Sequence, residues 1–260
     1  MRTLVYYAFI GIFASIAVPA FAASPWNGTW KLDQSKSQMT GDTFTYSVEP
    51  NGTYHFTNGS TLQFTFACDG KDYTVVSDYT TACKKVSDTT SAMTTRQNGK
   101  LISTSTQVIS ADGKTMTVTT NGTRPDGTAY TDVAVDRRIS GDSGLAGEWK
   151  TAKSSSSVSG VMKISTSGDT MTLEYPGYKQ TVTAKLDGTD TPFTGPRLPP
   201  GVTLSLKTQG PNEVMEVLKL NGKEWSKDLL TVSPDGQTLT DLSWTPGKDN
   251  EKQTYVYEKQ

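Results

Sequence analysis

The sequence is short of the side chains that most metal-binding and catalytic sites use. It has one histidine, His55, and two cysteines, Cys68 and Cys83, among 260 residues. A zinc site needs three or four such ligands, so no metal site is predicted. The 25 basic and 26 acidic residues nearly cancel, which excludes the basic field that nucleic acid attracts. We therefore expect no metal, no cofactor and no nucleic-acid partner.

Long apolar runs are absent after the first 22 residues. Those residues combine Arg2, an apolar stretch over 4–18 and the small-residue sequence Ala20-Phe21-Ala22, which together are typical of a secretory signal peptide. We predict a signal peptide over 1–23 and a periplasmic or secreted location of the Gram-negative kind. No later segment approaches the roughly 20 apolar residues of a membrane-spanning helix, so no membrane span is expected.

Amphipathic segments of helical length are also missing, and alternation of apolar and polar residues takes their place. It is seen in Phe44-Thr-Tyr-Ser-Val48, in Leu62-Gln-Phe-Thr-Phe66 and in Met171-Thr-Leu-Glu-Tyr175. This period of two is typical of half-buried antiparallel strands. Asn-Gly and Asp-Gly pairs separate the segments, and such pairs favour tight hairpin turns. The pattern predicts an all-β chain built as a meander.

An internal repeat divides the chain. Gly28-Thr-Trp-Lys31 has a near copy in Gly147-Glu-Trp-Lys150, and the stretch 110–117 aligns with 233–240, each at a separation of about 120 residues. A unit of that length is a whole domain rather than a solenoid repeat. We predict one domain over 24–140 and a second over 145–260.

Each repeat places a tryptophan on its first strand and a cationic residue on its last. We pair Trp30 with Arg137 and Trp149 with Lys259. A meander leaves two open edges, and joining the first strand to the last removes both. An indole covered by a cation would then plug the narrow end, a contact worth roughly 0.5–2 kcal/mol. The chain is thus predicted to form two closed barrels.

The Gly-x-Trp starts and the final Thr254-Tyr-Val-Tyr-Glu-Lys259 resemble the first and last strands of the calycin superfamily, which includes lipocalins and fatty-acid-binding proteins. The opening also resembles exported bacterial proteins with a Gly-Thr-Trp-Lys-Leu start. The resemblance implies two tandem antiparallel up-and-down, lipocalin-like β-barrels and a small hydrophobic ligand inside. Residues 33–42 leave too little room for the helical lid of fatty-acid-binding proteins, and no ligand-binding residue can be transferred.

The two cysteines lie about 15 residues apart, after the predicted signal peptide. In an oxidising compartment we expect a Cys68–Cys83 disulfide, which would stabilise the fold by roughly 3 kcal/mol.

The second repeat carries most of the residues that suit a ligand cavity. Its proline-rich stretch over 191–201 is expected to be an irregular loop, because proline is excluded from central strands. We interpret Phe193 and Arg197 as parts of a flap over a portal. The aromatic candidates for lining a cavity are Tyr175, Tyr178, Trp225 and Trp244. Ordinary core packing is the competing interpretation of these aromatic residues.

The leading functional hypothesis is an exported, non-enzymatic binding protein for a small hydrophobic molecule. An alternative is an envelope or secreted interaction module whose barrels are filled by their own side chains. No catalytic residue is predicted, since the chain shows no nucleophile and base pair. An enzyme would be indicated only by carboxylates and tyrosines that converge on a pocket with shifted pKa values. The sequence leaves the oligomeric state open.

Overall fold

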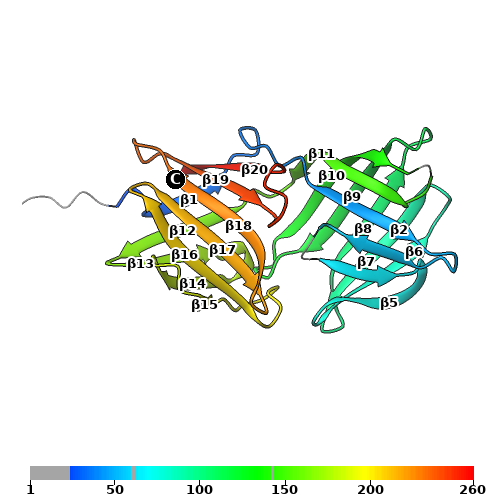
Figure 1. Ribbon diagram of the computed structural model, residues 1–260, viewed down its shortest axis with the longest axis horizontal. Helices are drawn as coiled ribbons and strands as arrows, with labels where there is room; N and C mark the ends of the chain where they lie inside the picture. The colour runs from blue at the N-terminus through cyan, green and yellow to red at the C-terminus, as the bar shows by residue number, and fades with distance from the viewer. Residues whose placement is uncertain (1–23, 60–61, 142) are drawn as a thin grey trace, which may run out of the picture.

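The computed structural model describes residues 24–59, 62–141 and 143–260. The predicted signal peptide, 1–23, lies outside the described residues. The described chain is all-β and forms two ten-stranded antiparallel sheets, each curled into a nearly closed barrel. The two barrels lie side by side along the long axis of the molecule (Figure 1). The predicted fold class is confirmed.

The barrel that we call the first contains strands β2 to β11 in chain order. Their bounds are β2 Thr43–Val48, β3 Tyr54–Thr57, β4 Gln63–Phe66, β5 Asp69–Val76, β6 Tyr79–Lys85, β7 Thr90–Gln97, β8 Lys100–Ile109, β9 Thr115–Thr123, β10 Ala129–Ser140 and β11 Gly147–Ser156.

The barrel that we call the second contains β1 together with β12 to β20. The bounds are β1 Gly28–Leu32, β12 Val161–Ser167, β13 Thr170–Tyr175, β14 Gln180–Lys185, β15 Thr191–Pro192, β16 Val202–Gly210, β17 Glu213–Leu220, β18 Lys223–Val232, β19 Thr238–Trp244 and β20 Gln253–Lys259. A single 3₁₀ turn, η1, spans Pro176–Tyr178 after β13.

The two Gly-x-Trp strands are exchanged between the repeats. Strand β1 lies between β12 and β20 of the second barrel, and β11 lies between β10 and β2 of the first. In Figure 1, β1 from the blue end of the chain joins the yellow, orange and red strands. The first barrel is therefore the continuous segment 43–156, inserted between the first strand of the second barrel and its remainder. The strands do not divide at the predicted boundaries, 24–140 and 145–260, because near-identical strands can complete either barrel.

The narrow ends are plugged by the two tryptophans, both fully buried. Trp30 Nε1 donates to the carbonyl of Trp26 at 3.0 Å, and Trp149 Nε1 donates to the carbonyl of Leu145 at 2.9 Å. Gly147 (φ 138°) precedes the plug because the carbonyl of Ser140 occupies the space where a Cβ would stand.

The cations that cover the plugs differ from the predicted ones. Lys259 lies 4.8 Å from the ring centroid of Trp30, and Arg138 lies 4.0 Å from that of Trp149. Each cation is directly opposite its tryptophan in the strand register. Arg137 is exposed, because alternate side chains of a strand point to opposite faces. The predicted pairs Trp30–Arg137 and Trp149–Lys259 are therefore wrong, and the exchange of strands explains both corrections.

The seam of each barrel is closed differently. In the first barrel, Cys68 after β4 is bonded to Cys83 on β6, which confirms the predicted disulfide and ties the end of edge strand β4 to β6, the neighbour of the other edge strand β5. In the second barrel, Gly188 N donates to Leu206 O at 2.8 Å and Thr208 N donates to Leu186 O at 3.2 Å, which joins the end of β14 to β16.

The open ends of the two barrels face each other. Arg124, in the β9–β10 turn, donates to the carbonyl of Val158 at 3.0 Å and lies over the ring of Tyr178 in η1. Tyr79, at the start of β6, donates to the carbonyl of Arg197 at 2.8 Å. All these contacts come from the ends opposite the tryptophan plugs. Both mouths are consequently sheltered at the junction, while the plugged ends point outward.

The insertion predicts which fragment folds. Residues 43–156 contain every strand of the first barrel and both cysteines, so this fragment should fold alone and unfold cooperatively. The matched fragment 43–146 lacks β11 and its Trp149 plug, and should stay unfolded. Far-ultraviolet circular dichroism and urea unfolding of both fragments test this. A folded 43–146, or an unfolded 43–156, would contradict the assignment of β11 to the first barrel.

The disulfide is expected to stabilise the first barrel at its seam. Replacing Cys68 and Cys83 together by alanine should lower the free energy of unfolding of the first barrel by about 3 kcal/mol, since a cross-link over 15 residues restricts the unfolded chain. Guanidinium unfolding of fragment 43–156, oxidised and alanine-substituted, gives the difference. A loss well below 1 kcal/mol would mean that the disulfide does not hold the seam.

Candidate functional site

The predicted ligand-binding residues do not form one site. Phe193 is buried in the core of the second barrel, where its ring lies 6.2 Å from that of Tyr175. Trp225 packs against the same core, at an irregularity in the pairing of β17 with β18. Trp244 lies at the end of β19, with Lys252 Nζ 4.4 Å from its ring centroid.

Two of the predicted residues belong to the contact between the barrels. Tyr178 stacks under Arg124, and Arg197 Nη2 donates to the carbonyl of Thr123 in the first barrel at 3.1 Å. The proline-rich segment is thus anchored at both Phe193 and Arg197. In this structure it packs against the core and the neighbouring barrel.

Three acidic residues that the sequence analysis did not single out converge inside the second barrel. Glu216 on β17 is opposite Asp228 on β18, and Asp241 lies on the adjacent strand β19, opposite Leu230. Each occupies the same face of its strand as core residues, namely Val214, Leu230 and Leu239. The three carboxyl groups therefore point into the barrel, above its apolar floor. Glu216 is only 8% exposed.

The hydrogen bonds of the acidic cluster are incomplete. Ser226 Oγ donates to Asp228 Oδ2 at 2.8 Å, and Ser243 adds a second hydrogen bond to the same carboxyl group. Asp241 Oδ1 is buried without a hydrogen-bond partner in the described part of the chain. Buried polar atoms are normally paired, so each such atom needs an explanation.

Burial raises the pKa of all three carboxyl groups, and their mutual repulsion adds to the effect for Glu216 and Asp241. The serine hydrogen bonds act in the opposite direction on Asp228. No lysine or arginine contributes to any of the three shifts. The cluster therefore favours its protonated, neutral state at pH values where exposed carboxyl groups are ionised.

Three tyrosines face the acidic cluster. Tyr175 comes from β13, and Tyr255 and Tyr257 come from β20, where Tyr255 is directly opposite Asp241. Burial, followed by the nearby carboxyl groups, raises the pKa of Tyr255 to about 12, and the pKa values of Tyr175 and Tyr257 are raised further. All three stay neutral hydrogen-bonding groups over the physiological range.

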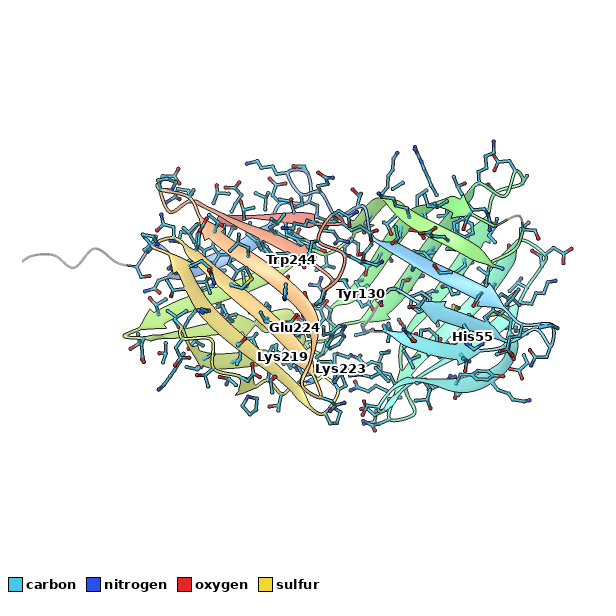
Figure 2. All side chains as sticks on the ribbon, viewed as in Figure 1. His55, Tyr130, Lys219, Lys223, Glu224 and Trp244 are labelled. Carbon is cyan, nitrogen blue, oxygen red and sulfur yellow. A yellow bond between two sulfur atoms is a disulfide. The ribbon has the colours of Figure 1, made fainter. Side chains whose placement is uncertain are left out.

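A cavity of about 170 Å³ lies at the open end of the second barrel, next to the acidic cluster. Its lining residues are Asp42, Ser226, Ser243, Trp244, Thr245, Glu251, Gln253 and Tyr255. Ser226 and Ser243 are the two serines that bind Asp228, so they connect the cavity to the carboxyl groups. Trp244 Nε1 is buried there and has no hydrogen-bond partner in the described chain. Trp244 and Tyr130, which begins β10 near the facing mouth, are labelled in Figure 2.

The segment that crosses between the barrels contributes to this cavity. Asp42 immediately precedes β2 of the first barrel, and burial raises the pKa of its carboxyl group. Thr43 Oγ1 donates to Glu251 at 2.9 Å, and Lys248 Nζ donates to Thr43 Oγ1 at 2.8 Å. The rim thus carries both signs of charge, with Lys248 and Glu251 tied to the first residue of β2.

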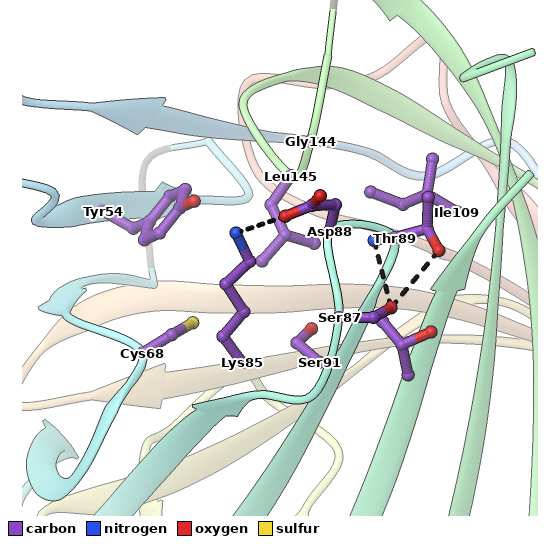
Figure 3. A pocket seen from close by; sticks show the side chains of 11 residues that line it. Tyr54, Cys68, Lys85, Ser87, Asp88, Thr89, Ser91, Ile109, Gly144 and Leu145 are labelled. Atoms are coloured by element: carbon purple, nitrogen blue, oxygen red, sulfur yellow. Dashed lines mark hydrogen bonds and ion pairs between the residues drawn. The ribbon is translucent and has the colours of Figure 1, made fainter. Parts of the chain in front are cut away.

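The first barrel has fewer features of a ligand-binding site than the second. Its interior is filled by an aromatic cluster, Phe44, Tyr46, Tyr54, Phe56, Phe64 and Phe66. A cavity of about 130 Å³ lies near its plugged end, where Lys85 and Asp88 pair at 2.7 Å (Figure 3). Its buried Asp136 accepts a hydrogen bond from Thr151 Oγ1 at 2.9 Å. His55 is on the outer surface, 2.8 Å from Glu49.

Two findings limit the chemistry of the described residues. They hold no group of three or more His, Cys, Asp or Glu side chains arranged to bind a metal ion. Within the same residues, no helix is long and apolar enough to cross a membrane.

No protein-family model, curated protein or solved structure matches this chain. The site therefore has to be interpreted from its own geometry.

The raised pKa of Glu216 predicts an unusual dependence of stability on pH. The folded protein holds this proton above the pH at which the unfolded chain releases it, so Glu216 lowers stability as the pH rises from about 4.5. Glu216→Gln removes that loss. The variant should gain about 1 kcal/mol or more over the wild type at pH 8, as expected when a buried group no longer needs to ionise.

The matched control is Glu174→Gln, because Glu174 lies on the outer face in an ion pair with Lys163. Urea unfolding at several pH values compares the three proteins. The free energies of unfolding of Glu216→Gln and wild type should differ more at pH 8 than at pH 5. An equal difference at the two pH values would mean that the placement of Glu216 inside the barrel is wrong.

Proposed function

We propose that the chain is a binding protein that holds one small organic molecule in the second barrel, at the end facing the first. The observation that carries this proposal is the set of unpaired groups at the cavity. Trp244 Nε1, which lines the cavity, and Asp241 Oδ1, in the acidic cluster behind it, are buried without a hydrogen-bond partner among the described residues. Leaving such groups unpaired costs about 1–3 kcal/mol each, and a bound molecule would recover that energy.

The architecture supports the proposal. Barrel mouths are common places for small ligands, and the cavity of the second barrel lies at its open end, whereas that of the first lies near its plugged end. The first barrel then acts as a cover, since its β2 end and its β9–β10 turn stand over the mouth of the second. Export is proposed with the function, and the disulfide supports it because disulfides persist in oxidising compartments.

The lining alters the expected class of ligand. A purely hydrophobic molecule would need an apolar cavity of about 300 Å³ or more. The cavity in the second barrel is smaller and is lined by carboxyl, hydroxyl and amide groups. We therefore propose a molecule with a polar or charged end that faces the acidic cluster.

A proton-transfer enzyme is a second candidate function. Carboxyl groups and tyrosines with raised pKa values converge beside a cavity, which is the arrangement that general acid catalysis needs. Binding without turnover is favoured because burial pushes the three carboxyl groups and the three tyrosines inside the barrel toward their neutral forms. Glu251, a lining carboxyl group whose pKa is lowered, is already bound to Thr43 and Lys248 at the rim.

Native mass spectrometry of the protein purified from the envelope of its own cells tests the binding proposal. We expect a stoichiometric adduct that is released on unfolding. Trp244→Phe should weaken its retention, whereas Trp149→Phe at the plug of the first barrel should not. A bare chain in the wild type, together with no rise in Tm against a panel of amines, sugars, fatty acids and aromatic acids, would contradict the proposal.

A further inference from the structure

The interior of the second barrel has acidic groups and no basic counterpart. Glu216, Asp228 and Asp241 come from three adjacent strands, and no lysine or arginine contributes to their electrostatics. Like charges opposite each other in a sheet are destabilising, and a buried carboxylate without a counter-ion is costly. An arrangement of this kind is stabilised by a positive charge supplied from outside the chain.

A second observation points to a ligand independently of the carboxyl groups. Trp244 lines the cavity with its indole N–H unpaired, so a bound molecule needs a hydrogen-bond acceptor to pair that donor, and Lys252 already lies against the indole ring. Tyr255 lines the same cavity. Aromatic faces and acidic groups together are the usual surroundings of a bound organic ammonium group.

We infer that the cavity takes an organic cation, a primary amine or guanidinium compound, whose charged end lies toward Ser226, Ser243 and the carboxyl groups behind them. This inference rests on the proposed binding function and adds the chemical class of the ligand. An anion is disfavoured because no basic group of the described residues contributes to the shifts of the three carboxyl groups, and Lys248 at the rim is already paired with Glu251. A metal ion is disfavoured because the described residues form no group of ligands for one.

Binding of such a cation is coupled to a proton. The neutral acid loses its proton to solvent as the ammonium group arrives, leaving a carboxylate paired with the ligand. The groups that face the cluster are Tyr175, Tyr255 and Tyr257, with Asp42 at the mouth. The tyrosines do not ionise near neutral pH, so the proton comes from a carboxyl group. Affinity for the amine should therefore rise with pH as long as the cluster still holds that proton before binding.

The experiment compares matched amines and alcohols by isothermal titration calorimetry of the full chain. Suitable pairs are benzylamine with benzyl alcohol and tyramine with tyrosol. We expect each amine that binds to do so at least about 10-fold more tightly than its alcohol, equivalent to about 1.4 kcal/mol. Titrations at pH 7 in buffers of different ionisation enthalpy should report net release of protons when the amine binds.

Single substitutions test whether the acidic cluster is responsible for amine binding and proton release. Asp241→Asn and Glu216→Gln should each weaken amine binding about 10-fold and reduce proton release, while Glu174→Gln on the outer face should change neither. The proton release of the wild type tests the inference even if a variant fails to fold.

The outcomes separate this inference from the proposed function. Equal binding of amine and alcohol without proton release, or a neutral or anionic molecule retained from cells, would overturn the cation and leave the binding function standing. No bound molecule from cells, and no binding of any compound of the panel, would overturn both.

Discussion

The exchange of the two Gly-x-Trp strands is the constraint on which the rest of the molecule depends. Because β1 completes the second barrel and β11 completes the first, the chain must cross between barrels at 33–42 and again at 157–160. These short crossings hold the open ends together and leave the tryptophan plugs outside. They also bring Asp42 and Thr43 over the mouth of the second barrel. The fold therefore builds a sheltered site from two barrels that would otherwise each open to solvent.

Under the proposed function, the two barrels divide the tasks of stability and binding. The first is filled by packed aromatic rings and sealed by a disulfide, and its buried Asp136 has a hydrogen-bond donor in Thr151. The second has an apolar floor around Trp30 and carries three adjacent acidic groups above it. Proteins keep such costly groups where function requires them. Under the proposed function, one copy of the repeat serves structure and the other holds a ligand.

Much of the fold could be predicted from the sequence, because alternation and turn pairs are local signals. The disulfide and the tryptophan plugs followed from spacing. The exchange could not be predicted, since the repeats show that Trp30 and Trp149 are equivalent without showing which barrel each enters. Choosing Arg137 over its neighbour Arg138 failed for a related reason, because adjacent residues of a strand point to opposite faces and the register decides between them.

The acidic cluster was missed although the strands contain a signal for it. In Val214-Met-Glu-Val-Leu218, the glutamate stands in phase with apolar residues, and Asp228 and Asp241 stand in phase with Leu230 and Leu239. A carboxyl group in the apolar phase of a strand indicates a buried acid. Only the pairing of β17, β18 and β19 shows that three such groups meet.

The central claim is that the acidic cluster is held toward its neutral state inside the barrel and that one carboxyl group ionises when the proposed ligand binds. Carbon-13 NMR titration of the side-chain carboxyl groups measures this directly, with signals assigned through Glu216→Gln, Asp228→Asn and Asp241→Asn. The account predicts that Glu216 and Asp241 remain protonated well above the usual range of carboxyl groups. Titration of both near pH 4 would contradict it.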